Sequence, residues 1–243
     1  MKKAAMAARV GNRILSIMAG ILILLMLSYG MYSLWDTYKI YANSFADEEL
    51  LKFRPTDDGE DNPTLKDLKK LNPDVKAWIQ VPKTNIDYPV VQGQDDMEYI
   101  NKNVYGEFEL SGAIFLSCLN KDDFSDPYNL VYGHNMKNGS MFAGLKNYSD
   151  QSYAEAHPYI YVDLADGSHC YEIFSAHEAD ATDITYTIGY RANDTYASFL
   201  DSLKTASLYD TGVEVTKDDS VISLSTCTKS GEKRFVVHAK KLY

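Results

Sequence analysis

The feature that most constrains this chain is a run of 22 residues without a charge near its N-terminus, from Ile14 to Trp35. At about 1.5 Å per residue, a helix of this length spans the roughly 30 Å hydrocarbon core of a bilayer. A cleavable signal peptide has a shorter apolar stretch that ends at small residues, whereas this run ends in bulky residues such as Tyr32. The sequence therefore predicts a transmembrane anchor, with cleavage near Ala42 or Ser44 as the alternative.

The charges around this segment predict its orientation. Four cations and no acid precede it, namely Lys2, Lys3, Arg9 and Arg13, and such cations stay in the cytoplasm. The whole chain has 24 Lys and Arg against 34 Asp and Glu, a net charge of −10, so the part beyond the anchor is acidic. This balance disfavours a nucleic-acid partner. We expect a single-pass protein of the cell membrane with a cytoplasmic N-terminus and an extracellular main domain.

Composition divides the chain into four parts. The predicted parts are a basic cytoplasmic N-terminus (1–13), the transmembrane helix (14–35), a linker with N-terminal helices (36–70) and the main domain (71–243). Within the linker, an acidic stretch rich in turn residues is followed by Asn62-Pro63, a typical helix start, and by leucines at helical spacing. A short amphipathic helix is therefore expected to precede the main domain.

From Ala77 onward, short apolar segments alternate with turns. The segments are AWIQV, DYPVVQ, GAIFLS, NLVYGH, YIYVDL, CYEIFSAHEA, VISLSTC and RFVVHAKKL. Short strands at such spacing predict a closed or sandwich-like β architecture. One segment between two late strands, 194–210, instead has apolar residues at helical spacing. The main domain is therefore predicted to be mainly β with one inserted helix.

The first candidate catalytic residues lie on the last two predicted strands. Period-two alternation in VISLSTC places Cys227 at a strand end, on the same small polar face as Ser225. The next strand begins near Arg234 after a short turn, so an antiparallel hairpin would lay Arg234 beside Cys227. A guanidinium lowers the pKa of a nearby thiol and offers donors to an oxyanion, as acyl transfer requires. The alternative is a buried structural cysteine next to a surface arginine.

A nucleophilic cysteine also needs a proton-transfer partner, and the chain has 5 histidines. His238 lies four residues beyond Arg234 on the same strand, about 13 Å away at 3.3 Å per residue, which is too far from Cys227. His157 and His169 occur in turn-like sequence, and His177 has no distinguishing context. His134 ends the strand YNLVYGH and precedes a loop, where catalytic groups tend to lie. Taken alone, a histidine in such a position is more often structural.

These residues carry a resemblance to a known family. LSTC followed after seven residues by Arg, with YGHN upstream, resembles the sortases, the membrane-anchored cysteine transpeptidases of Gram-positive bacteria. NPDVKAWIQV, TNIDYPVVQG, GAIFLS and RFVVHAKKL are similar to segments of class B sortases in the same order, and the inserted helix also resembles that class. The resemblance covers roughly residues 71–242. It implies an eight-stranded sortase-like β-barrel with N-terminal helices and a helix inserted before the strand that bears the cysteine.

The resemblance also implies roles for individual residues. It gives Cys227 as the nucleophile, His134 as the general acid and base, and Arg234 as the residue that stabilises the oxyanion and orients the substrate. Such an enzyme cleaves a C-terminal sorting signal after Thr and transfers the thioacyl intermediate to an amino group of a cell-wall precursor or a pilin. The implied partners are therefore a surface protein that bears the sorting signal and an amine acceptor.

Five further positions correspond to substrate-contacting positions of class B sortases. They are Ser225, Asp96, Ile100, Thr182 and Tyr186. The chain departs from the class at Cys118, where many members carry Asp, and a regulatory role or a disulfide with Cys170 is an open alternative. The three cysteines show no CxxC spacing that would predict a zinc site. No metal or other cofactor is expected.

Two other functions remain as alternatives. A secreted cysteine peptidase acting on peptidoglycan would also use Cys and His, but such enzymes usually place the cysteine before the histidine, at the start of a helix. Here His134 precedes Cys227, and Cys227 ends a predicted strand. A non-catalytic surface binding module on a membrane stalk would be compatible with the 19 tyrosines and the acidic surface. Labelling of the predicted nucleophile separates this module from the enzymes.

Overall fold

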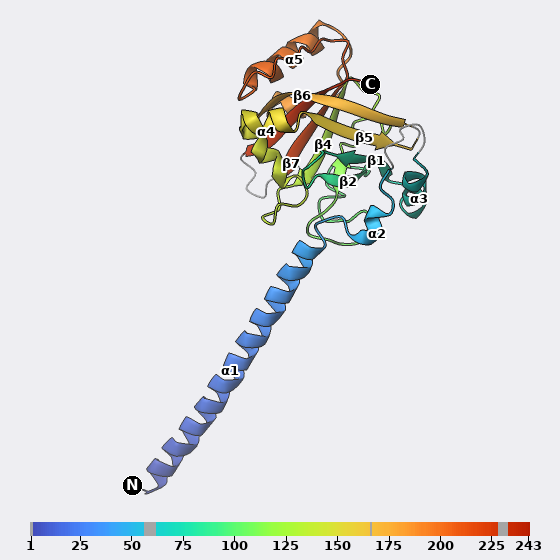
Figure 1. Ribbon diagram of the computed structural model, residues 1–243. Coiled ribbons are helices and arrows are strands. Elements are labelled where there is room, and N and C mark those ends of the chain that lie inside the picture. Colours follow the sequence, from blue (N-terminus) through green and yellow to red (C-terminus); the bar gives the residue numbers. More distant parts are fainter. Residues whose placement is uncertain (1, 56–61, 166, 228–232) are drawn as a thin grey trace. The chain divides into compact units, whose positions relative to one another are not determined.

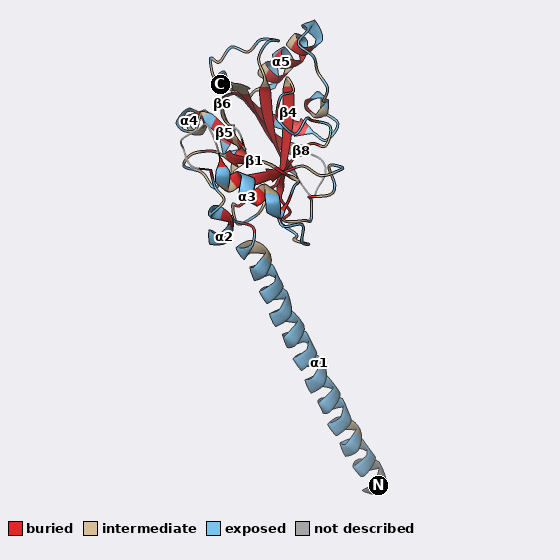
Figure 2. Ribbon diagram, turned by 90° about the vertical axis from the view of Figure 1, so that its right-hand side faces the viewer, coloured by how far each residue is buried: buried red, intermediate tan, exposed pale blue. Residues whose placement is uncertain are grey.

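The computed structural model describes residues 2–55, 62–165, 167–227 and 233–243. The chain forms two units, residues 1–42 and 43–243. The first unit is the helix α1 (Lys2–Ala42) (Figure 1), and Figure 2 shows it as largely exposed. Within the described residues, α1 is the one helix long and apolar enough to cross a membrane. It continues beyond Trp35, where the uncharged segment ends.

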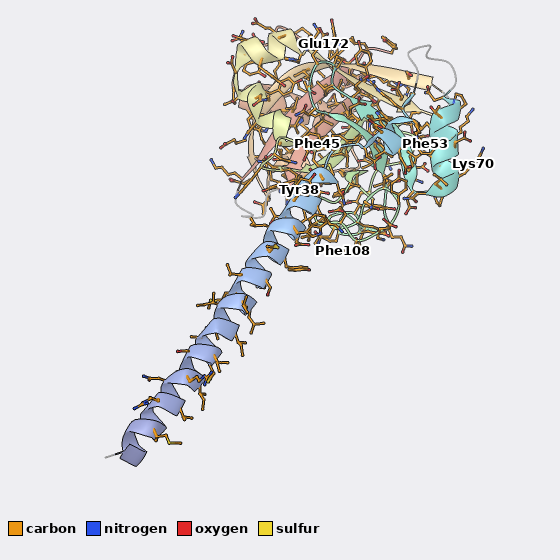
Figure 3. All side chains as sticks on the ribbon, turned by 60° about the horizontal axis from the view of Figure 1, so that its bottom comes forward. Tyr38, Phe45, Phe53, Lys70, Phe108 and Glu172 are labelled. Carbon is orange, nitrogen blue, oxygen red and sulfur yellow. The ribbon has the colours of Figure 1, made fainter. Side chains whose placement is uncertain are left out.

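The second unit begins with two short helices whose ends follow from local chemistry. In α2 (Glu48–Leu51), the Asp47 side chain accepts a hydrogen bond of 2.7 Å from the backbone N–H of Leu50. In α3 (Pro63–Leu71), proline occupies the first turn as predicted. Leu65 and Leu68 are buried, while Lys70 lies on the exposed side of α3 (Figure 3). The predicted amphipathic helix is therefore present.

Eight strands close into a barrel, as the sequence predicted. They are β1 (Val75–Gln80), β2 (Asp87–Val91), β3 (Ile114–Leu116), β4 (Tyr128–His134), β5 (Tyr159–Leu164), β6 (Gly167–Asp180), β7 (Val221–Cys227) and β8 (Lys233–Lys241). Their order around the barrel is β1-β2-β3-β4-β7-β8-β6-β5. The pairs β2–β3 and β4–β7 are parallel, and the other neighbours are antiparallel.

Short helices fill the connections between strands. They are η1 (Ala143–Ser149) and α4 (Gln151–Ala156) after β4, then η2 (Ile184–Tyr186) and α5 (Asp194–Ala206) between β6 and β7. The inserted helix α5 was predicted, and Asn193 caps it by accepting from the Tyr196 N–H. The sequence did not predict η1, η2 or α4. His169, interpreted as a loop residue, lies within β6 and pairs with Val162.

The strands have two buried faces, which explains why they are apolar on both sides. One cluster draws side chains such as Ile79, Val131 and Leu224 from all eight strands and fills the barrel interior. A second cluster lies on the outer face, where residues of β4 and β7 pack under α5. Figure 2 shows the strands as largely buried, in contrast to the exposed α1. The outer face of β4 and β7 is thus covered by the inserted segment.

Gly133 is required at its position by close packing. A Cβ added there would lie 2.4 Å from Ile114 Cδ1 and 2.7 Å from the ring of Phe142. Both distances are far shorter than real carbon contacts allow, and both neighbours belong to the buried interior. The interior can therefore close around the end of β4 only when a glycine precedes His134.

Two histidines pack together on the outer face of β6 and β8. The rings of His177 and His238 stack with centroids 5.1 Å apart, and His238 Nδ1 lies 2.5 Å from Ser223 Oγ. Burial, reinforced by His177, lowers the pKa of His238 well below its usual value. Burial also lowers the pKa of His177, although Asp183 opposes this shift. The pair is therefore neutral in the folded protein near neutral pH.

This neutral pair should make the stability of the domain depend on pH. An unfolded histidine takes up a proton near pH 6.5, whereas His238 in the folded state does not. The unfolded state binds more protons as the pH falls, so this contribution to stability is complete above about pH 6.5 and is lost below it. Between about pH 7 and pH 5, the free energy of unfolding of His238→Gln, which cannot titrate, should fall less than that of the wild type.

Chemical denaturation at several pH values measures this difference. The carboxylates titrate in both proteins, so only the difference between the two slopes reports on the histidine. Identical slopes for the two proteins would contradict the prediction.

Candidate active site

The candidate site is built on the parallel pairing of β4 with β7. The register pairs every residue of the two strands and ends with His134 opposite Cys227. Neighbouring strands lie about 4.8 Å apart, and paired residues project to the same face. The backbone therefore brings the two residues side by side at the ends of their strands. The side chain of Cys227 lies outside what the structure describes.

The antiparallel pairing of β7 with β8 determines where Arg234 lies along the strands relative to Cys227. The described pairs run from Val221 with Lys240 to Ser225 with Val236. One residue further, Thr226 Oγ1 accepts a hydrogen bond of 2.9 Å from the backbone N–H of Phe235. Extended by one more residue, this register would set Cys227 against Arg234, which is the placement that the hairpin argument expects. Residues 228–232 of the predicted turn lie outside the described residues.

The imidazole of His134 is held by the backbone. His134 is 7% exposed, and its Nε2 lies 2.7 Å from the carbonyl oxygen of Ile100. A carbonyl can only accept, so Nε2 carries the hydrogen. In the neutral ring the basic nitrogen is then Nδ1, which becomes the atom able to exchange a proton. Ile100, a predicted substrate contact, thus lies at the site and orients His134 through its main chain.

The guanidinium of Arg234 rests on an aromatic ring. Its Cζ lies 5.0 Å from the centroid of the Tyr186 ring, a distance at which cation–π attraction operates. Arg234 Nε is buried and, within the part of the chain that the structure describes, has no hydrogen-bond partner. Among the described residues, Arg234 also forms no ion pair with a carboxylate. A guanidinium held by a ring face keeps its N–H donors available for a ligand.

Tyr186 links three parts of the site. Its hydroxyl lies 3.0 Å from Ser225 Oγ, and its ring stacks on Tyr132 with an interplanar angle of 10°. Tyr186 therefore contacts Ser225 through its hydroxyl and Arg234 through its ring. All three are predicted site residues. Tyr132 was not among the predicted site residues, although period-two alternation on β4 sets it on the same face as His134. That alternation was the available signal.

The other two predicted contacts have different surroundings. Asp96 accepts hydrogen bonds from the Cys118 backbone N–H at 2.7 Å and from Ser117 Oγ at 3.0 Å. It therefore fixes the turn after β3. Thr182 is exposed in the turn after β6, two residues before η2. The structure does not bring either side chain into the contacts around Arg234.

The two described cysteines are both free thiols. Cys118 and Cys170 form no disulfide with each other. Burial and the adjacent carboxylate of Asp96 raise the pKa of Cys118, and burial raises that of Cys170. Both are therefore protonated at neutral pH, unlike a thiolate nucleophile. In the described part of the chain, no group of three or more His, Cys, Asp or Glu side chains is placed to hold a metal ion.

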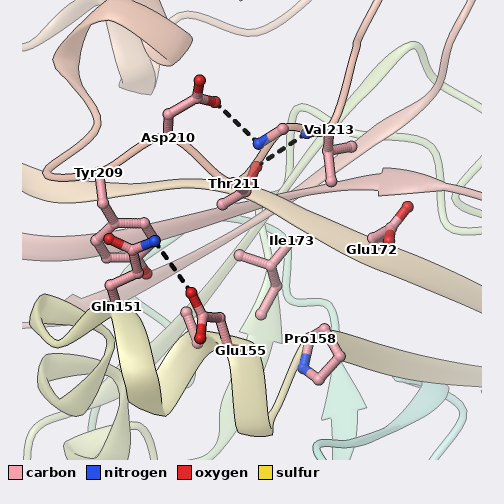
Figure 4. A pocket seen from close by; sticks show the side chains of 11 residues that line it. Gln151, Glu155, Pro158, Glu172, Ile173, Tyr209, Asp210, Thr211 and Val213 are labelled. Carbon is pink, nitrogen blue, oxygen red and sulfur yellow. Dashed lines mark hydrogen bonds between the residues drawn. The ribbon is translucent and has the colours of Figure 1, made fainter.

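A separate pocket lies near α4, away from these residues. Its volume is about 490 Å³, and its wall includes Pro158, Glu172, Ile173 and Tyr209 (Figure 4). Glu155, which also lines it, accepts a hydrogen bond of 3.0 Å from Gln151. Glu172 pairs with Lys240, toward the opposite end of β8 from Arg234. The pocket is therefore not part of the candidate active site.

The fold and this arrangement define a class of enzyme. Residues 79–242 match the sortase domain, and the chain belongs to the sortase family. Sortases are cysteine transpeptidases that anchor or process surface proteins, so neither the peptidoglycan peptidase nor the binding module is favoured. The similarity to sortase B is specific: the chain is 37% identical over 186 residues to Sortase B of Listeria monocytogenes, covering 75% of each protein.

Other sortase B proteins are similar in sequence and structure. Sortase B of Staphylococcus aureus is 32% identical over 181 residues, which cover 73% of this chain and 74% of that protein. A structure titled Staphylococcus aureus sortase B-substrate complex matches with a TM-score of 0.72 and 31% identity, covering 75% of this chain and 86% of that one. Clostridium perfringens sortase B matches with a TM-score of 0.68 and 34% identity, covering 73% and 99%. The eight-stranded barrel is thus that of sortase B.

The contacts of Asp96 lead to a prediction about stability. Asp96→Ala removes the acceptor of two hydrogen bonds in the turn after β3, so the free energy of unfolding should fall by about 1–3 kcal/mol. Asp96→Asn keeps one acceptor oxygen and should recover part of the loss. Urea denaturation measures the change, with the KM for a sorting-signal peptide determined in parallel. A raised KM at unchanged stability would instead assign Asp96 to the substrate.

Proposed function

We propose that Cys227, His134 and Arg234 perform a transpeptidation on C-terminal sorting signals. The thiolate of Cys227 attacks the carbonyl carbon of the Thr residue, and protonated His134 gives its proton to the departing amine of the next residue as the C–N bond breaks. A thioester remains. An amino group of a cell-wall precursor or a pilin then attacks the thioester while His134 accepts its proton, and the thiolate leaves.

The observation that carries this proposal is the backbone register of β4 and β7, with His134 opposite Cys227. It supports a nucleophile and a proton-transfer group at neighbouring strand ends, which is the pairing that cysteine catalysis requires. The contact between Ile100 and Nε2 supports Nδ1 as the atom that exchanges the proton. The chain order, with histidine before cysteine and the cysteine ending a strand, agrees with a sortase.

Arg234 is proposed to stabilise the oxyanion and orient the substrate. Negative charge develops on the carbonyl oxygen during both steps, and a fixed guanidinium placed there lowers the barrier. The cation–π contact with Tyr186 supports this role because it fixes the group without consuming its donors. We further propose that Ser225, Ile100 and Tyr186 contact the sorting signal, because all three lie around His134 and Arg234; Asp96 and Thr182 stay predictions from the resemblance. A related sortase B has been determined in a substrate complex, and another sortase B structure holds a triglycine peptide.

The helix α1 is proposed to anchor the enzyme in the cell membrane. Its uncharged segment is long enough to cross a bilayer, and the four cations before it favour a cytoplasmic N-terminus. The catalytic domain would then face outward, where a surface protein and its amine acceptor meet. No cofactor enters the proposed reaction.

Incubation of the full-length protein with sorting-signal peptides and amine acceptors tests the proposed function. A ligated product identified by mass spectrometry, together with a thioester on Cys227, is expected. Absence of ligation with every combination of peptide and wall or pilin amine would contradict transpeptidation. Hydrolysis without ligation would favour a peptidase.

Substitutions of the three residues should produce different losses. Cys227→Ala should abolish the thioester because the nucleophile is gone. His134→Ala should lower kcat by about 10²–10⁴-fold through lost proton transfer, and Arg234→Ala should cost about 2.7–4 kcal/mol in kcat/KM if it acts as a typical oxyanion donor. Arg234→Lys should recover only part, since a point charge cannot reproduce the fork of donors. Steady-state kinetics measures each loss.

A remote histidine provides the matched control. His157 lies at the end of α4 and bonds to the Tyr153 carbonyl through Nδ1 at 2.9 Å. His157→Ala should retain the wild-type rate when compared at equal thermal stability. Normal turnover in His134→Ala would overturn the assignment of His134.

The anchor is tested by membrane extraction. Full-length protein should remain with membranes after a carbonate wash, because the apolar surface of α1 has no partner in water. Deletion of residues 1–35 should release it. Release of the intact chain by the wash, or an N-terminus beginning near Ala42 in the mature protein, would favour cleavage instead.

A further inference from the structure

Tyr128 connects the start of β4 to the segment that carries Tyr186. Its hydroxyl donates a hydrogen bond of 2.7 Å to the carbonyl oxygen of Thr185, in η2. The Tyr128 side chain is buried, and burial raises the pKa of its hydroxyl well above the usual value. The group is therefore protonated and able to donate. Thr185 is itself fully buried and immediately precedes Tyr186 in the chain.

The Tyr128 ring is fixed by an aromatic cluster. It packs edge-on against Phe199 of α5, with centroids 4.9 Å apart, and against Tyr190, at 6.1 Å. Tyr190 in turn stacks on Phe199 at 4.2 Å. Such packing leaves the hydroxyl little freedom to move. The bond to Thr185 thus joins a rigid part of the outer core to the wall of the active site.

The bond from Tyr128 to Thr185 has a fixed direction. The Thr185 carbonyl can only accept, so the Tyr128 hydroxyl donates to it. On the neighbouring strand β7, the Ser223 hydroxyl lies 2.5 Å from His238 Nδ1.

We propose that Tyr128 is a positioning residue for the active site. Its hydroxyl fixes Thr185 and thereby holds the Tyr186 ring against the guanidinium of Arg234. The catalytic consequence rests on the role proposed above for Arg234, whereas the positioning itself does not.

The position of the Arg234 guanidinium can be measured in the absence of substrate. Nuclear magnetic resonance of full-length protein, labelled with ¹⁵N in arginine only, reports the Nε–Hε group of Arg234, and Arg234→Lys assigns it. The π electrons of a nearby ring shift this resonance, so Tyr186→Leu defines its frequency without the ring. Tyr128→Phe should move the resonance toward that of Tyr186→Leu.

A matched control lies in the same aromatic cluster. The Tyr196 hydroxyl also donates to a backbone carbonyl, that of Pro127, at 2.5 Å. It does not contact the Thr185–Tyr186 segment, so Tyr196→Phe should leave the Arg234 resonance and kcat unchanged. An equal shift in Tyr128→Phe and Tyr196→Phe would mean that general loosening of the cluster is the cause, and would overturn the proposal. A wild-type resonance in Tyr128→Phe would overturn it directly.

Kinetics provides the second readout. Tyr128→Phe should lower kcat/KM about threefold to tenfold, the size expected from one lost hydrogen bond, mainly through kcat. A change in KM alone would contradict an effect exerted through Arg234. If the wild-type protein shows no transpeptidation, the proposed function fails, but the resonance still decides whether Tyr128 positions Arg234.

Discussion

The parallel ladder between β4 and β7 is the interaction on which the active site depends. It joins two segments far apart in the sequence and sets His134 opposite Cys227. A shift of this register by one residue would turn one of the two side chains to the other face of the sheet. The packing of Gly133 against Ile114 and Phe142 opposes such a shift, because any side chain at the glycine position would clash. Interior packing therefore protects the register that pairs His134 with Cys227.

The segment between β6 and β7 provides the wall of the site. It is long, but it is not a free loop, because α5 and the aromatic side chains around Tyr128 are part of the outer core. Tyr186 leaves this core to contact Ser225 and the guanidinium of Arg234. A wall made of core-anchored aromatic residues loses little conformational entropy when substrate binds. The packing that covers the outer face of the barrel thus also holds Tyr186 in place beside Arg234.

Local sequence signals predicted much of the architecture. Apolar segments predicted all eight strands, and the spacing of residues in 194–210 predicted α5. The ladder between β4 and β7 could not be derived from pattern, since parallel pairing depends on non-local packing. The main-chain contact of Ile100 with His134 has no signature in side-chain type. Asp96 was assigned by resemblance, while its described contacts are with the turn after β3.

Three histidines share the outer face of the sheet, and their surroundings separate their chemistry. His177 and His238 stack in the core, where burial keeps them neutral. Their charged forms would be costly there, so they suit a structural hydrogen-bonding role rather than a reaction that cycles between charged and neutral states. His134 lies at the strand end, beside a backbone carbonyl that can stabilise the imidazolium by accepting its Nε2 hydrogen. Of the three, only His134 is paired with Cys227 in the β4–β7 register and has its Nε2 against a backbone carbonyl.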